Sequence, residues 1–367
     1  MQHKTPLALF TLLLLWLPGA HAQGEWLLFT DVTATARDLP ADMTPVMATR
    51  ELEPMLTLFG NLDQERYQVL FEGMAKPDTM AIERLQLGWN MDQNNTLWIG
   101  RFHNPFDYWS DRFHHGLYFQ TSQSRPGVVA FEEDGGVMPI HLSGLLLSGI
   151  RLTPDMAGIR YDLALGVGPQ VQGDSDGSRL ESPSPLAPLE RNGRHGQALS
   201  LRLTYLPDIL DENELGLFIS RTRMPTENVN NIYGDVIQLA GGLFGHWQKA
   251  HFKLLGAAIV IRHQLNMAMP GTVRQTMNHL LSNQYLQGEY GFRPRWQVYA
   301  RLETTQGIKD DPYIQSFAMF VEDRALLGLR HDYRRQQAIR LELARARHQH
   351  NAAPFNSLAL QWSALWP

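Results

Sequence analysis

The chain has 367 residues, with 32 lysines and arginines against 37 aspartates and glutamates, and it contains no cysteine. The net charge of −5 argues against a strongly basic nucleic-acid-binding protein, so we expect no nucleic-acid partner. Without cysteine the fold cannot be held by disulfides, so its stability has to come from packing or from closure of a sheet.

The first 22 residues carry the pattern of an export signal. His3 and Lys4 form a short polar start, residues 7–17 are apolar, and Ala20-His21-Ala22 supplies the small residues that signal peptidase recognises. The apolar run is shorter than the ~20 residues that a transmembrane helix needs. We therefore expect residues 1–22 to be a cleaved signal peptide and residues 23–367 to form the mature protein.

The mature sequence alternates between apolar and polar residues, as strands with two different faces do. In segment 82–91 the apolar residues share one face and the polar residues share the other. The apolar set is Leu85, Leu87, Trp89 and Met91, and the polar set is Arg84, Gln86, Gly88 and Asn90. Residues 92–95 follow as a turn and residues 96–102 as the partner strand, which predicts a β-hairpin.

The same alternation recurs in later segments. They are residues 159–166, 199–205, 215–220, 296–303, 324–330 and 339–343. The sequence therefore predicts an all-β fold with 14–18 strands. We favour about 16, because single-chain bacterial barrels have an even number of strands.

A soluble β-sandwich with one hydrated face would alternate in a similar way. Three features favour a transmembrane antiparallel β-barrel instead. The segments have the ~10 residues that a tilted transmembrane strand requires, and their polar faces mix arginine with acids as a hydrated lumen would. Their apolar faces include aromatic rings suited to the membrane interfaces, at Trp89, Tyr161, Tyr205 and Trp296.

Two parts of the pattern need separate predictions. Residues 234–247 and 250–262 are apolar on both faces, which we interpret as strands packed on an interior plug or loop, with their faces unassigned. The last strand alternates to the end, with Leu358, Leu360, Trp362, Ala364 and Trp366 on one face. Such a strand is typical of the signal that the barrel assembly machinery recognises, although Pro367 follows the terminal aromatic residue.

Residues 103–141 form the longest stretch without clear alternation, and connections longer than ~12–15 residues are often functional. Its neighbourhood carries a family resemblance. Gly100-Arg101-Phe102 with Pro105-Phe106 resembles the strand ends of Gram-negative porins related to the phosphate-selective type. The continuation through His114-His115-Gly116, Arg125-Pro126 and residues 132–136 looks like an uncharacterised subgroup with the same barrel.

This resemblance implies a porin-like barrel in which the long loop folds into the lumen and narrows it. The charged and histidine side chains of the loop then become candidates for the constriction. These candidates are Arg112, His114, His115, Arg125, Glu132 and Glu133. Phosphate selectivity does not carry over, because the phosphate-selective porins depend on a lysine-rich lumen and this sequence has few lysines.

The polar faces of the predicted strands supply candidate pore-lining residues. They are Arg84, Arg160, Arg202, Arg301, Arg330, Arg340, Asp162, Glu303 and Glu342. A ladder of arginines would attract anionic solutes. The same residues could instead form cross-strand ion pairs that keep the lumen hydrated and the barrel rigid. The sequence leaves both interpretations open.

Metal binding is a weaker hypothesis. His114 and His115 on a loop could join His103, His141 or Glu132, but such sites need three or four converging ligands. Residues 173–178 have alternating acids without the spacing of a complete calcium loop. We expect no metal and no cofactor, and we interpret residues 169–197 as an extracellular surface loop.

The function that these patterns favour is a passive channel for small hydrophilic solutes across the outer membrane, with anionic solutes as a candidate class. We do not expect an enzyme. The alternatives are a non-conducting barrel with a binding or scaffold role and, less favoured, a barrel-embedded hydrolase using His114 or His115 with Ser122 or Ser124. The expected partners are outer-membrane lipid, the barrel assembly machinery, small solutes and, in a homo-oligomer, further copies of the chain.

Overall fold

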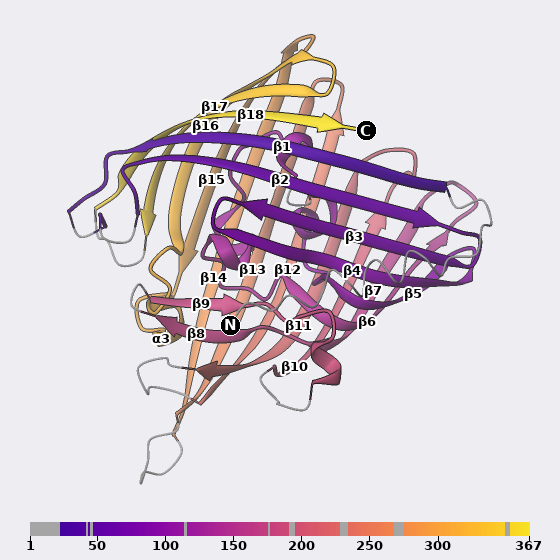
Figure 1. Ribbon diagram of the computed structural model, residues 1–367, viewed down its shortest axis with the longest axis horizontal. Helices are drawn as coiled ribbons and strands as arrows, with labels where there is room; N and C mark the ends of the chain where they lie inside the picture. The colour runs from indigo at the N-terminus through magenta and orange to yellow at the C-terminus, as the bar shows by residue number, and fades with distance from the viewer. Residues whose placement is uncertain are drawn as a thin grey trace.

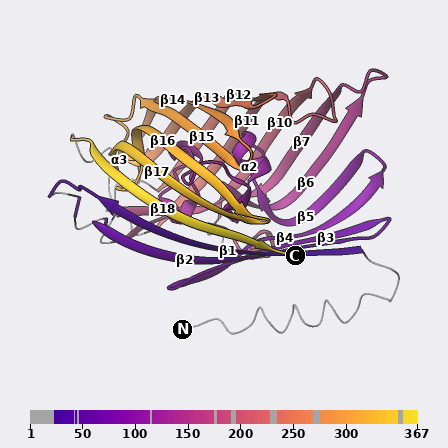
Figure 2. The ribbon, with the colours of Figure 1, turned by 90° about the horizontal axis from the view of Figure 1, so that it is seen from above.

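The computed structural model describes residues 23–41, 43–44, 47–113, 116–174, 177–190, 195–227, 234–267, 275–348 and 353–367. The expected signal peptide lies outside the described residues. Within them, sixteen antiparallel strands form a closed barrel, which confirms the predicted fold class and strand number. Figures 1 and 2 show these strands wrapped around several short helices.

The strands of the barrel wall are as follows. They are β1 (Gln23–Arg37), β2 (Arg50–Asp63), β3 (Tyr67–Lys76), β4 (Thr79–Asp92), β5 (Asn95–His103), β6 (His141–Leu152), β7 (Gly158–Val167), β10 (Gln197–Leu206), β11 (Glu214–Glu227), β12 (Asp235–Lys249), β13 (Phe252–Met267), β14 (Gln275–Arg293), β15 (Trp296–Gln306), β16 (Val321–Arg334), β17 (Gln337–His348) and β18 (Phe355–Trp366).

The barrel closes between its first and last strands. β18 pairs with β1, where Val32 faces Trp362, and β1 also pairs with β2, where Val32 faces Pro54. The wall therefore has no free sheet edge at this seam, and backbone groups that would be costly to leave unpaired in lipid are bonded to a neighbouring strand.

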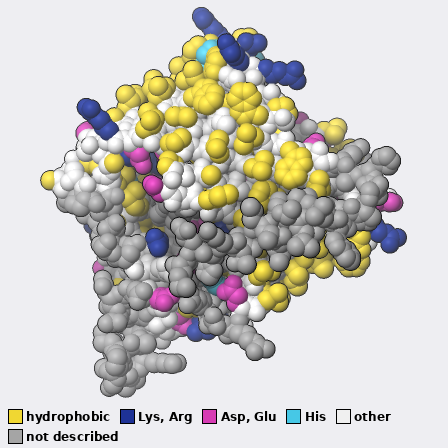
Figure 3. All heavy atoms as spheres, viewed as in Figure 1, with side chains coloured by type: hydrophobic (Ala, Val, Ile, Leu, Met, Phe, Trp, Pro, Cys, Tyr) yellow, Lys and Arg dark blue, Asp and Glu magenta, His cyan; other side chains and the backbone are white. Residues whose placement is uncertain are grey.

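The alternation of the sequence corresponds to the two faces of the wall. In β4, Leu87 and Trp89 are each 49% exposed, whereas Arg84 and Gln86 are 7% and 5% exposed. In β10, Leu199 and Tyr205 point outward while Ser200, Arg202 and Thr204 are buried. Hydrophobic side chains gather over the outside of the wall in Figure 3. This outer face suits lipid, and the inner face meets the polar interior of the barrel.

The two ends of the barrel differ. The turns at residues 250–251, 294–295 and 335–336 are short, and they lie at the end where β1 begins and β18 finishes; we call this the short-turn end. The connections 104–140, 168–196 and 307–320 lie at the opposite, long-loop end. The connection 307–320 contains the short helix α3 (Pro312–Gln315).

The inner faces of β12 and β13 are mostly apolar, with Gln238, His246 and His263 as buried polar residues, which settles the segments whose faces the sequence left unassigned. Val236, Phe244, Ile259 and Ile261 are almost completely buried, although they point into the barrel. They belong to one hydrophobic core with residues of the connections 104–140 and 307–320. These two strands are apolar on both sides because one side meets lipid and the other meets folded loops.

Residues 169–197 differ from the surface loop that we expected. They form a hairpin of β8 (Gln170–Asp174) and β9 (Gly177–Glu181), and β8 pairs in parallel with the end of β11 at Val171 and Thr226. Val171 is 0% and Leu180 4% exposed, and both belong to the hydrophobic core. Burial of this pair fixes the hairpin against the inside of the barrel.

Gly100 marks the point where β5 approaches the connection that turns into the barrel. It has a φ of +133°, and a Cβ atom there would lie 2.0 Å from the carbonyl oxygen of Leu85. Gly100 pairs with Gly144, and Gly144 pairs with Gly166, so three neighbouring strands lack side chains at this level. The close approach of these backbones requires glycine.

We predict that Gly100→Ala lowers the free energy of unfolding by about 1–3 kcal/mol, the usual cost of a strained backbone position. Urea unfolding of the lipid-reconstituted protein, followed by heat-modifiable mobility on a gel, measures the change. Gly288→Ala is the matched control, since no atom lies within 4 Å of the added Cβ there. Equal stability of the two variants would contradict the prediction.

Candidate functional site

The connection between β5 and β6, residues 104–140, is the lumen loop. It contains α2 (Tyr108–Arg112) and three short 3₁₀ turns, η1 (Leu117–Phe119), η2 (Gly127–Val129) and η3 (Glu132–Asp134). Phe106, Trp109, Val128 and Val129 are completely buried in the hydrophobic core that also includes the inner faces of β12 and β13. The loop therefore folds into the barrel rather than away from it, as the resemblance implied.

Asp107 and Tyr108 fix the start of α2 against the wall. The Asp107 carboxylate accepts a hydrogen bond from the backbone N–H of Ser110 at 3.1 Å and another from the Tyr285 hydroxyl at 2.5 Å. The ring of Tyr108 stacks on His246 with 4.5 Å between centroids. The helix is thus capped and attached to β12 and β14 at the same point.

An acid–arginine cluster joins the end of α2 to strands β7, β10 and β11. Its central bonds are those of Arg202, whose Nη2 lies 2.6 Å from Asp111 Oδ1 and 2.8 Å from Asp162 Oδ2. Arg160 Nη2 lies 2.8 Å from Asp111 Oδ2 and 3.2 Å from Glu214 Oε2, and Arg112 Nη2 lies 3.0 Å from the same Glu214 oxygen. Four of the residues selected from the sequence, Arg112, Arg160, Asp162 and Arg202, therefore meet in one network.

The charge of Asp111 depends on this network. Burial raises the pKa of Asp111, but the guanidinium groups of Arg202, Arg160 and Arg112 together outweigh burial and hold the pKa well below the usual range of an aspartate. Asp111 is therefore ionised at neutral pH and holds three arginines near one point of the lumen.

Three arginines of the opposite wall hold the backbone of residues 117–125; we call Arg301, Arg330 and Arg340 the arginine clamp. Arg340 donates from Nη2 to the carbonyl oxygens of Leu117 at 2.9 Å and Tyr118 at 2.8 Å, and from Nε to Gln120 at 3.1 Å. Arg330 donates from Nη1 to the carbonyls of Tyr118 and Gln120 at 2.8 and 2.6 Å.

Arg301 extends the clamp along the loop. Its Nη1 donates to the carbonyl of Ser124 at 2.9 Å, and its Nη2 donates to the Ser124 hydroxyl at 3.0 Å and to the carbonyl of Arg125 at 3.1 Å. The inward arginines that we expected to face free solute therefore bind mainly backbone carbonyls of the lumen loop. A carbonyl partner carries no sequence signal, so no pattern of side chains could have shown it.

The predicted acids Glu303 and Glu342 hold the same loop from the wall. Glu303 accepts from the backbone N–H of Gly127 at 2.6 Å, and Glu342 accepts from the backbone N–H of Gln123 at 3.0 Å and from the Ser124 hydroxyl at 2.8 Å. Arg324, which the sequence-based set left out, donates to Glu303 and to the carbonyl of Arg125. Its place on the polar face of segment 324–330 was the available signal.

A third group lies where the lumen loop returns to β6. His141 Nδ1 lies 2.7 Å from Glu132 Oε2, His141 Nε2 lies 3.3 Å from Glu83 Oε2, and Arg101 Nη2 lies 3.0 Å from that same oxygen. The ring of His103 packs on His141 with 5.0 Å between centroids. Glu83 was missed because a bulge opposite Glu72 and Gly73 turns it inward next to Arg84.

The remaining predicted residues have simpler surroundings. Arg84 Nε forms an ion pair with Glu72 at 2.6 Å. Arg125 lies 3.9 Å from the ring centroid of Phe131 and donates from Nε to the Val129 carbonyl at 3.1 Å. His114, His115 and the side chain of Glu133 lie outside the described residues, and so does part of segment 173–178. In the described ranges, no three His, Asp or Glu side chains are grouped as a metal ion would need.

The fold and the loop together define the class. A closed barrel of sixteen antiparallel strands, apolar outside and crossed inside by a long loop, has the architecture of outer-membrane porins. None of the helices in the described part of the chain has the length and hydropathy of a transmembrane helix. The predicted porin-like barrel is therefore confirmed at the level of the fold.

Solved structures show which porins the chain is similar to. An anion-selective porin from Comamonas acidovorans covers 94% of this chain with 100% of its own length, at 11% identity and a TM-score of 0.60. The outer membrane channel DcaP of Acinetobacter baumannii covers 94% with 97% of its length, at 11% identity and a TM-score of 0.59. The trimer form of OmpT from Vibrio cholerae covers 94% with 99% of its length, at 8% identity and a TM-score of 0.54.

No protein-family model matches the sequence, and no curated protein matches it. At these sequence identities the similarity establishes the fold alone.

We predict that Arg340→Met loosens the lumen loop and lowers the free energy of unfolding by about 2–4 kcal/mol, because several buried carbonyls lose a charged donor. The loop should become open to chymotrypsin at Tyr118 and Phe119, with fragments identified by mass spectrometry. Arg334→Met, at an exposed arginine on neighbouring β16, is the matched control. Equal protection of the loop in both variants would show that the clamp does not hold it.

Asp111→Asn should destabilise the barrel at neutral pH, and the destabilisation should shrink as the pH falls below about 4. The pKa of Asp111 is lowered in the folded state, so its contribution is complete above the unfolded pKa of about 4 and is lost as the pH falls below it. Urea unfolding from pH 8 to pH 3 measures the difference. Asp155→Asn, in the exposed turn after β6, is the matched control.

Proposed function

We propose that this protein is a porin-like channel through which small hydrophilic solutes diffuse passively across the outer membrane. The observation that carries the proposal is the lumen loop. It enters a barrel whose outer face is apolar, and charged residues of the wall bind it on both sides of the lumen. Porins narrow their lumen with a loop of this kind, and the mixed charges along it give a hydrated, size-limited path.

The asymmetry of the barrel supports an orientation. Outer-membrane barrels have short turns on the periplasmic side and longer loops outside. In this orientation the short-turn end faces the periplasm, and the lumen loop and the β8–β9 hairpin enter from the cell surface. The apolar outer face makes membrane lipid a partner. Strand β18 is proposed as the segment that the assembly machinery recognises.

A preference for anions is the finer part of the proposal. The hydrogen bonds of Arg340 go to uncharged oxygens, those of the loop carbonyls, Gln361 and Ser363. Such bonds fix a guanidinium group without cancelling its charge. Arg301 donates to carbonyls, a hydroxyl and an amide, but its Nε also lies 3.5 Å from Glu303 Oε1, so its charge is partly balanced. The ion pairs of the acid–arginine cluster across the lumen contribute less net charge. The anion selectivity of the Comamonas porin agrees with this proposal.

A non-conducting barrel with a binding or scaffold role is the second candidate. The observation that favours it is the hydrophobic core inside the barrel, in which Val128, Val171, Ile314 and Phe317 are almost completely buried. A hydrolase is not proposed, because Ser124 is bonded between Arg301 and Glu342 and holds the loop. Assembly of several copies is part of the main proposal, as in the trimer form of OmpT.

We predict stepwise conductance when the refolded protein is added to planar bilayers, with a reversal potential that reports anion preference in a salt gradient. Arg301→Gln with Arg340→Gln should move the anion-to-cation permeability ratio toward one, most clearly at low ionic strength where charges are least screened. Lys249→Gln, at an exposed position at the end of β12, is the matched control.

The two outcomes of this experiment separate the candidates. A barrel with the heat-modifiable mobility of a folded protein that never conducts would contradict the channel and favour the scaffold. Conductance with an unchanged permeability ratio in the double variant would retain the channel and remove the role of the arginine clamp in selectivity.

A further inference from the structure

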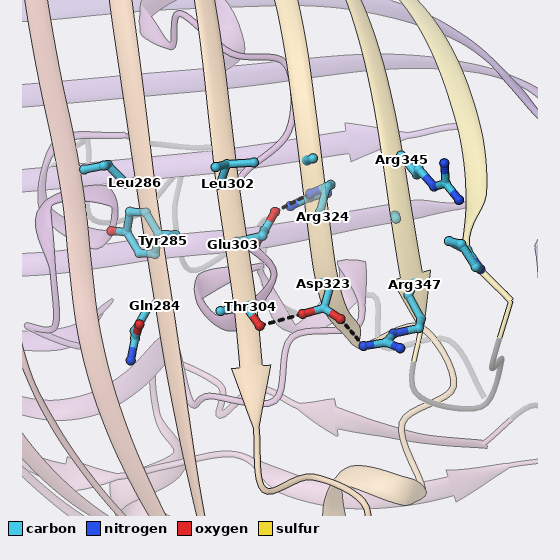
Figure 4. Close-up of a pocket in the computed structure, with 13 residues that line it drawn as sticks. Gln284, Tyr285, Leu286, Leu302, Glu303, Thr304, Asp323, Arg324, Arg345 and Arg347 are labelled. Atoms are coloured by element: carbon cyan, nitrogen blue, oxygen red, sulfur yellow. Dashed lines mark hydrogen bonds and ion pairs between the residues drawn. The ribbon is translucent and has the colours of Figure 1, made fainter.

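A groove of about 510 Å³ lies on the outer wall of the barrel across β14, β15, β16 and β17 (Figure 4). Leu286, Leu302 and Ala325 line its apolar part, and they point away from the lumen, since Leu286 is 54% and Leu302 68% exposed. This surface belongs to the lipid-facing side of the wall and takes no part in the proposed solute path.

The other part of the groove is polar. Gln284, Thr304, Asp323, Arg345 and Arg347 line it from the same four strands. Asp323 accepts a hydrogen bond from the Thr304 hydroxyl at 2.6 Å and forms an ion pair with Arg347 (Figure 4). Arg347 Nε also lies 3.3 Å from Glu322 Oε2, so the charge of Arg347 is already balanced.

Arg345 differs from Arg347 because it is exposed and, within the described ranges, no residue forms a hydrogen bond or ion pair with it. Its cross-strand neighbours are Ala325 and Asn356, neither of which carries a charge. Among the effects that lower the pKa of Asp38, the charge of Arg345 is the smallest. Counting only residues that the structure describes, the groove therefore contains one guanidinium group whose charge has no close partner.

The position of the groove along the barrel axis indicates which part of the membrane it contacts. On β15 and β17 the outward residues change from apolar to polar toward the long-loop end, from Leu302 to Thr304 and from Leu343 to Arg345. Along β15, the outward positions from Trp296 to Thr304 span about 20 Å of the barrel axis, which is close to the ~25 Å apolar band of such barrels. The polar part of the groove thus lies where acyl chains give way to headgroups, on the side that we assign to the cell surface.

We propose that this groove binds a phosphorylated lipid of the outer leaflet, with a lipid phosphate at Arg345 and an acyl chain along Leu286, Leu302 and Ala325. A guanidinium group matches phosphate oxygens with two parallel hydrogen bonds, which explains an unpaired arginine at this depth. The site rests on the proposed orientation of the barrel but not on the channel function, because all of its contacts lie on the outside of the wall.

Native mass spectrometry of the refolded full chain in detergent tests the proposal. The probes are a lipid A-type glycolipid carrying two phosphates and the same glycolipid without phosphates. The wild type should retain the phosphorylated lipid about tenfold more strongly, and Arg345→Gln should reduce its retention by about the same factor, as loss of a charge-assisted hydrogen bond implies. Arg151→Gln, at an exposed position near the short-turn end of β6, should leave retention unchanged.

A second variant tests the apolar part of the groove. Ala325→Phe fills the groove without changing its charge and should also reduce retention of the phosphorylated lipid. If Arg345→Gln does not fold, as judged by its mobility on a gel, Ala325→Phe alone decides the test. Equal retention of the two lipids, full retention by the folded variants, or complete displacement of the lipid by an equal concentration of inorganic phosphate would each overturn the proposal.

Discussion

Unpaired backbone N–H and C=O groups cost several kcal/mol each in lipid, where no water can bond to them. A sheet in that environment has to close on itself, and the pairing of β18 with β1 satisfies this requirement. Closure in turn decides which way every side chain points, because successive residues of a strand face opposite sides. The lipid surface, the lumen surface and the position of the lumen loop all depend on that first condition.

Closure also creates an interior that the chain has to fill or hydrate. This protein does both. The side of the lumen formed by β12 and β13 is mostly apolar and packs against Phe106, Trp109 and α3, as a soluble protein packs its core. The side formed by β15, β16 and β17 is polar, and its arginines bind backbone carbonyls of residues 117–125. The lumen loop thus has a hydrophobic anchor on one wall and a charged anchor on the other.

Period-2 alternation was sufficient to predict the wall, since lipid imposes it on every strand that it contacts. It was sufficient as well to predict that Arg202, Arg301 and Arg340 point inward, but not which groups they meet. Asp111 lies 91 residues from Arg202, and the partners of Arg340 are carbonyl groups that every residue possesses. The hairpin β8–β9 escaped prediction because its inward signal consists of only two residues, Val171 and Leu180, in a segment rich in glycine, serine and proline.

The contacts of the hairpin β8–β9 limit which insertions this part of the chain can accept. Its strand β8 pairs with β11, and the backbone N–H of Ser178 in β9 donates to the carbonyl of Ser316 beside α3 at 2.7 Å. Exposed loop tips are the usual sites where a protein tolerates an inserted peptide. Here the hairpin shares its core with the lumen loop, so a peptide grafted into it would also disturb the lumen loop. In the proposed orientation and function, variation of this hairpin at the cell surface would therefore alter the solute path.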